Sequence, residues 1–224
     1  MKSLRNIAIV LAAILLSAPL VYGQDLSKYR NFSLGTDLDG ISKQVNKTSV
    51  DAVVIHPSPA LIQEMTYWPY RSYQSSAQSD PVQEIVFSFY NGELYKVAIT
   101  YEGSATQGMT PADMVRAISA EYGDATMAAG AANLPDVGIY DSIGAPIATW
   151  GNTQYLMTLA RSPLSSAFQL VFVSKQLNGQ ADAAIAEASR QAREDAPQKE
   201  IARAKKEVDD LEARRQTNLK TFHP

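Results

Sequence analysis

The chain has 224 residues, no cysteine, two histidines and a formal net charge of −3. The lack of cysteine excludes disulfides, thiolate metal sites and a lipid-bearing cysteine, so stability must come from the core alone. An acidic balance disfavours nucleic acid and anionic lipid as partners, because both attract clustered basic charge.

The first 23 residues have the pattern of a cleaved secretory signal. Lys2 and Arg5 precede an apolar run over 7–16, and 21–23 supplies the small residues that a signal peptidase reads. The apolar run is about ten residues long, whereas a membrane span needs roughly 20, so cleavage after Gly23 is favoured over an uncleaved anchor. The sequence therefore predicts a secreted or periplasmic protein that is soluble after cleavage.

The segment after the signal predicts one short helix and two strands. Asp37 precedes an apolar-periodic stretch that ends at Val45, as expected of a capped helix. The β-rich segments 50–55 and 61–68 are separated by Pro57 and Pro59. The Asp-Leu-Asp-Gly sequence at 37–40 resembles the start of a calcium loop. The later oxygen ligands are missing, so we expect no metal and no cofactor.

The densest aromatic segment follows, and it is our first candidate for a binding site. It comprises Tyr67, Trp68, Tyr70, Arg71 and Tyr73. Tyrosine, tryptophan and arginine are favoured at protein interfaces, and aromatic rings also stack on sugars. The alternative is that Tyr67 and Trp68 merely end a strand, with one ring in the core. The polar stretch 70–80 is expected to be an irregular loop.

The strongest local signal is a β-hairpin over 82–101. Asn91-Gly92 is the preferred dipeptide of a two-residue type I′ turn. That turn predicts the cross-strand pairs Phe89–Leu94, Phe87–Lys96 and Ile85–Ala98. The opposite face then carries the apolar side chains Val86, Tyr90, Tyr95, Val97, Ile99 and Tyr101. We expect the C-terminal helix, a second copy or an envelope partner to cover it, with Tyr95 and Tyr101 as contacts.

The second half of the globular part repeats the order of helix and strands. Thr110, Pro111 and Asp113 begin a helix that Gly123 ends. The small-residue stretch 125–132 predicts a flexible loop, and 147–150, 154–160 and 168–174 predict strands. The similar helix starts suggest an internal duplication, with one unit over 24–104 and another over 105–178. The fold class is α+β: two helix-plus-three-strand units that form two antiparallel sheets or one continuous sheet.

A charged helix over 179–220, kinked or broken at Pro197, is expected to end the chain. The segment is dominated by alanine and charged residues, which are good helix formers. Ile201, Ala204, Val208 and Leu211 form a two-heptad apolar seam. A coiled coil usually needs three or four heptads, so a protruding solvated helix is favoured over self-association through 198–215.

Two short motifs resemble known bacterial proteins. The pattern Phe32-x-Leu34-Gly35-x-x-Leu38-x-x-Ile41, followed by meandering strands, resembles the repeats of BamE-like (SmpA/OmlA) lipoproteins and the β-lactamase-inhibitor-protein fold. The hairpin over 87–94 and the charged C-terminal helix resemble uncharacterised bacterial secreted proteins. The resemblance covers 29–177 and implies a protein-binding, non-enzymatic role in the bacterial envelope. The lipid-bearing cysteine of BamE-like proteins is absent, so their membrane anchoring does not carry over.

Function is the least determined property of the sequence. Patterns such as G-x-S-x-G, H-E-x-x-H and the P-loop are absent. We therefore favour a binding protein whose partner is a protein of the cell envelope. One alternative is an envelope hydrolase that uses carboxylates such as Glu64 and Glu84, which would need environments that separate their pKa values. Another is a structural adaptor that acts through the C-terminal helix.

Overall fold

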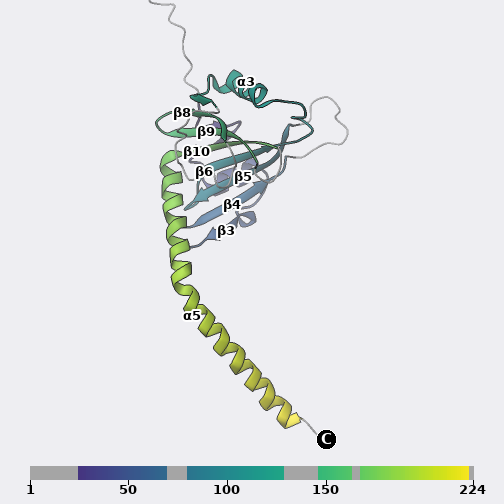
Figure 1. Cartoon of the computed structure of the whole chain (residues 1–224), viewed down its shortest axis with the longest axis vertical. Coiled ribbons are helices and arrows are strands. Elements are labelled where there is room, and N and C mark those ends of the chain that lie inside the picture. The colour runs from purple at the N-terminus through teal and green to yellow at the C-terminus, as the bar shows by residue number, and fades with distance from the viewer. Residues whose placement is uncertain (1–24, 70–79, 129–145, 163–166, 222–224) are drawn as a thin grey trace, which may run out of the picture.

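The computed structural model describes residues 25–69, 80–128, 146–162 and 167–221 (Figure 1). The predicted signal at 1–23 lies outside these ranges. The first half contains β1 (Lys28–Tyr29), β2 (Phe32–Ser33), α2 (Leu38–Gln44), the 3₁₀ turn η1 (Ser49–Asp51), β3 (Val53–His56), β4 (Ile62–Tyr67), β5 (Val82–Tyr90) and β6 (Glu93–Tyr101). The second half contains α3 (Pro111–Tyr122), β7 (Met127–Ala128), β8 (Pro146–Gly151), β9 (Tyr155–Arg161), β10 (Phe168–Ser174) and α5 (Lys175–Thr221). The fold class is α+β, as predicted.

Within the described residues, eight strands form one antiparallel sheet in the order β3-β4-β5-β6-β10-β9-β8-β7. Each half supplies a helix and four consecutive strands of this sheet, and the four strands of the first half lie in segments predicted as strands. The halves meet where β6 pairs with β10, so the strand order is symmetric about that pair. The added strand of the second half is β7, which lies in a segment expected to be a loop and pairs with β8. Internal duplication remains a prediction.

The β5–β6 hairpin has the predicted turn but not the predicted register. Asn91 and Gly92 have φ values of 50° and 84°, as a type I′ turn requires. The Phe89–Leu94 pair forms, but a bulge follows it, and Ser88 pairs with Lys96 while Phe87 pairs with Val97. The bulge at Tyr95 shifts the pairs from Ser88–Lys96 to Glu84–Thr100 by one residue, and a second irregularity then pairs Val82 with Tyr101. The predicted face of Val97, Ile99 and Tyr101 is therefore wrong: all three face the same side as Phe87.

That shared face is the main hydrophobic core. Met65, Phe87, Phe89, Val97, Ile99, Leu170 and Phe172 lie in it, with Trp150 and Met157 from the second half. The helices α2 and α3 and the β1–β2 hairpin supply the other layer, through Phe32, Ile41, Met114 and Ile118. The Asp37 carboxylate accepts a hydrogen bond from the Gly40 amide, and Thr110 and Asp113 form a reciprocal capping box. These caps fix where both helices begin.

One end of α5 packs on the opposite face of the sheet. Ala181 is fully buried there against Ile62 and Tyr95, with Leu177 and Ile185 at the margin of the contact. The helix then leaves the sheet and extends alone (Figure 1), and every described residue from 192 to 221 is exposed. The helix continues through Pro197, although its axis changes direction part-way along (Figure 1).

Candidate functional site

Nine large apolar side chains among the described residues are conspicuously exposed, and they lie in two places. Four are on the outer part of α5: Ile201, Val208, Leu211 and Leu219. The other five, which we call the β3 edge patch, are Val50, Val53, Val54, Ile55 and Trp68. Clustered exposed apolar surface is typical of interaction sites, whereas single exposed apolar residues are common everywhere.

The β3 edge patch is built by the edge of the sheet. Within the described residues β3 is the last strand in the sheet order and pairs only with β4. Val53 faces the side of Glu64 and is 63% exposed, whereas Val54 faces the side of Gln63 and is 49% exposed. Both faces of this edge are therefore apolar and accessible to water. A bulge interrupts the strand between Val54 and His56, its last residue, and Pro57 follows, so the regular edge is short.

Trp68 extends this patch. The β3–β4 register carries the chain beyond Tyr67 back toward the residues that precede β3, and Lys47 Nζ lies 5.4 Å from the centre of the Trp68 ring. Trp68 is 59% exposed, whereas the ring of its neighbour Tyr67 packs against the main core. Of the predicted aromatic segment, Trp68 is thus the described residue placed at the surface. Tyr70, Arg71 and Tyr73 lie outside the described residues.

Tyr95 and Tyr101, predicted to share one face, are separated by the bulge. Tyr95 is 2% exposed beneath α5, where burial and the nearby Glu64 carboxylate raise the pKa of its hydroxyl to about 12. Tyr101 lies on the core face, and burial likewise raises the pKa of its hydroxyl. Neither ring forms an open sheet surface, and Tyr95 can meet a partner only if α5 moves.

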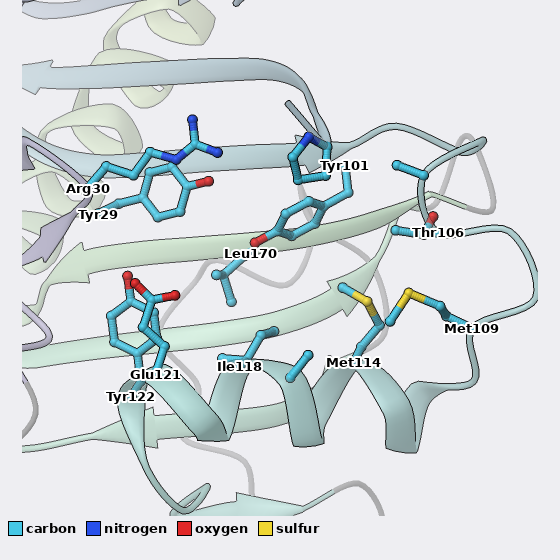
Figure 2. A pocket seen from close by; sticks show the side chains of 13 residues that line it. Tyr29, Arg30, Tyr101, Thr106, Met109, Met114, Ile118, Glu121, Tyr122 and Leu170 are labelled. Atoms are coloured by element: carbon cyan, nitrogen blue, oxygen red, sulfur yellow. The ribbon is translucent and has the colours of Figure 1, made fainter. Parts of the chain in front are cut away.

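Tyr101 instead lines a cavity of about 300 Å³ between α3, the β1–β2 hairpin and the end of β6 (Figure 2). We call it the tyrosine cavity. Its other aromatic lining residues are Tyr29 and Tyr122, whose rings both contact Phe172. Sequence reasoning missed this cavity, because its walls come from segments far apart in the chain, from Tyr29 to Leu170. Of its lining residues, Tyr101 was predicted as a contact, but on a different face of the sheet.

Arg30 lies at the rim of the tyrosine cavity, and its own backbone is strained. Its φ is 55°, in the left-handed region that residues other than glycine seldom adopt. Its guanidinium donates two hydrogen bonds to the Asp80 carboxylate, at 2.7 and 2.8 Å, and lies 5.1 Å from the centre of the Tyr29 ring. The hydrogen bonds to Asp80 raise the pKa of Arg30, so the guanidinium stays charged. The Asp80 carboxylate neutralises that charge.

The carboxylates proposed for an envelope hydrolase are far apart. Glu64 accepts a hydrogen bond of 3.0 Å from the Ser88 hydroxyl, and Glu84 lies four residues before Ser88 on the same strand. At about 3.4 Å per residue, Glu84 lies roughly 14 Å along the strand from Ser88, beyond the separations at which two carboxyl groups act together on one glycosidic bond. Within the described residues, no group of three or more histidine or acidic side chains is placed to hold a metal ion.

Comparison of the chain with protein-family models, curated proteins and solved structures finds no match. The resemblance to BamE-like proteins therefore stays a prediction. Among the helices of the described residues, none combines the length and apolar character that crossing a bilayer demands.

Proposed function

We propose that this protein is a secreted or periplasmic binding protein that docks an extended segment of a protein partner along the β3 edge patch. The single observation that carries the proposal is the gathering of Val50, Val53, Val54, Ile55 and Trp68 at one free sheet edge. The fold buries Phe87 and Ile99 completely but leaves much of these five side chains in water, where they stabilise the isolated chain little.

The chemistry of the edge favours an extended polypeptide as the occupant. Along its outer side β3 has no neighbouring strand within the described residues, so its backbone donors and acceptors are open to a ladder partner. An added strand would cover Val53 on one face of the sheet and Val54 on the other. Trp68 supplies an aromatic anchor of the kind that dominates binding energy at interfaces.

The shortness of β3 argues against pairing with a second copy through the same edge. The strand has four residues and is interrupted by a bulge, so two such edges could exchange only a few backbone hydrogen bonds. A flexible partner segment can follow the bulge and also reach Trp68. The partner is thus expected to contribute a short run of alternating apolar residues.

A selection from a library of random eight-residue peptides tests the proposal with the full mature chain. Recovered peptides should carry alternating valine, isoleucine or aromatic residues, and a Val53→Lys/Trp68→Ala double variant should lose at least tenfold in affinity for them. A matched Val208→Lys/Leu211→Ala variant, altered on α5, should bind them unchanged. Peptides that bind both double variants equally well would overturn the proposal.

A second candidate function, a structural adaptor, is favoured by the outer part of α5. The helix has 47 residues, yet its contacts with the sheet end near Ile185. In an antiparallel pair of such helices, Val208 of one copy would face Leu211 of the other. Lys205 would then lie near Glu212, and Glu207 near Arg214, so the flanking charges complement each other.

Sedimentation equilibrium separates the adaptor from a solvated helix. The adaptor predicts concentration-dependent dimers that Val208→Lys abolishes and Ala202→Lys, on the opposite side of the helix, leaves intact. A chain that stays monomeric at all concentrations would leave the β3 edge patch as the sole proposed contact.

A further inference from the structure

The tyrosine cavity has the form of a small-molecule site, independent of the β3 edge patch. At about 300 Å³ it is at the lower limit of natural ligand pockets. Since a water molecule takes about 30 Å³ of liquid, the space corresponds to about ten non-hydrogen atoms. Its rim also carries the strained Arg30, and unusual backbone of this kind clusters at functional sites.

The two ends of the cavity differ in chemistry (Figure 2). Met109 and Met114 lie at one end, and Ile118 and Leu170 continue this apolar wall. Methionine suits such a wall because its flexible thioether adapts to the shape of an apolar guest. At the other end the hydroxyls of Tyr29 and Tyr101 point toward one another, and the Tyr122 hydroxyl and the Glu121 carboxylate point in from α3 (Figure 2). A guest that satisfies both ends must be amphipathic.

The three phenols are hydrogen-bond donors at neutral pH. Burial raises the pKa of Tyr29, Tyr101 and Tyr122 above that of a free tyrosine, so each hydroxyl keeps its proton. The hydrogen bond between Tyr29 and Tyr101 uses the hydroxyl proton of one of them. The hydroxyl proton of the other remains available to a bound ligand. The phenols therefore offer a donor at the polar end, and a head group with an acceptor oxygen matches them.

The charges at the rim favour a neutral head group. The Asp80 carboxylate neutralises the Arg30 guanidinium, so the charge that remains at the rim is the negative charge of Glu121. That carboxylate would repel an anionic head group. Asp25 and Glu121 both act on Tyr122 as negative charges. An ammonium head carries only hydrogen-bond donors, so it offers no acceptor to the phenol hydroxyls.

We propose that the tyrosine cavity binds a neutral amphipathic acyl compound of about ten non-hydrogen atoms, with an amide or ester carbonyl at the tyrosine end and a short aliphatic chain at the methionine end. The carbonyl oxygen accepts hydrogen bonds from the phenols. The chain lies along Met114, Ile118 and Leu170.

Octanamide, with ten non-hydrogen atoms, is the probe for a titration of the full mature chain followed through the methionine methyl NMR signals. The Met109 and Met114 signals should shift, whereas those of Met65 and Met157, buried in the core, should not. Octanoate and octylammonium should each bind at least tenfold more weakly. Tyr101→Phe should weaken octanamide binding about two- to tenfold, as expected for one lost hydrogen bond.

Two exposed alanines of α3 provide a matched pair of variants. Ala117 lines the cavity, so Ala117→Trp should fill it and weaken octanamide binding at least tenfold. Ala120 is also exposed but is not part of the lining, so Ala120→Trp should bind octanamide normally. The proposal is overturned if Ala117→Trp binds as the natural chain does, if octanoate binds as tightly as octanamide, or if the Met109 and Met114 signals do not shift at millimolar octanamide.

Discussion

The strands β6 and β3 both carry β-branched apolar residues, but those of β6 are buried and those of β3 are exposed. On β6, Val97 and Ile99 are at most 1% exposed, because neighbouring strands flank β6 on both sides and the core layer covers one face. On β3, Val53 and Ile55 are 63% and 44% exposed. Composition makes both segments strands, but only position in the sheet decides whether their apolar side chains stabilise the fold. Apolar side chains that the fold leaves in water are those available to a partner.

The largest expected difference is in the free energy of unfolding. Ile99→Ala should cost about 2–5 kcal/mol, because it opens a cavity in the core. Ile55→Ala should change stability by less than about 0.5 kcal/mol, since the side chain is already in contact with water. Urea unfolding of both variants measures the contrast. Equal losses would mean that β3 is packed more tightly than the structure indicates.

Truncation of α5 extends the comparison to a helix with one packed end. A chain that stops after Asn178 loses Ala181 and exposes Ile62 and Tyr95, so we expect a loss of about 2–4 kcal/mol and increased binding of an apolar dye. A chain that stops after Gln191 should unfold as the full chain does, because the residues removed are exposed. If both truncations left stability unchanged, the contact between α5 and the sheet would be refuted.

The turn that joins β5 to β6 gives a smaller effect. Gly92 has a φ of 84°, and nothing lies within 4 Å of an added Cβ, so substitution there meets backbone strain and no steric clash. Gly92→Val should cost about 1–3 kcal/mol. Gly103→Val offers a comparison at a glycine that also has open space around it. Equal melting temperatures for the two variants would contradict the type I′ turn.

A pH dependence distinguishes Tyr95 from exposed tyrosines. Burial raises the pKa of its hydroxyl from 10.0 to about 12 in the folded chain. Its contribution to stability is therefore complete below pH 10 and is lost as the pH rises toward 12, because the unfolded chain ionises first. Tyr95→Phe should make the decline in stability between about pH 10 and 12 shallower. An unchanged decline would mean that α5 does not shield Tyr95.

Local signals predicted the elements well and the contacts between distant segments poorly. The Asn91-Gly92 turn and the Thr110 cap of α3 depend on short-range chemistry, and the structure confirms both. The bulge at Tyr95 has no local signature in the sequence, so the faces beyond it were predicted wrongly. The small residues around β7 predicted a loop, whereas the structure has a short strand there that pairs with β8.

The candidate sites show the same limit. Trp68 could be found from its aromatic neighbours, but its exposure depends on where β3 ends the sheet. The tyrosine cavity could not be found, because Tyr29, Tyr101 and Tyr122 become neighbours only when the β1–β2 hairpin and α3 pack on the same sheet face.

Amide hydrogen exchange of the full chain, with and without a peptide selected for binding, shows whether the β3 edge patch binds an extended segment of a partner. The amides of β3 should exchange at least tenfold more slowly in the complex, while those in the outer part of α5 should be unchanged. A tightly bound peptide that leaves the β3 amides exchanging at their original rate would contradict binding at this edge.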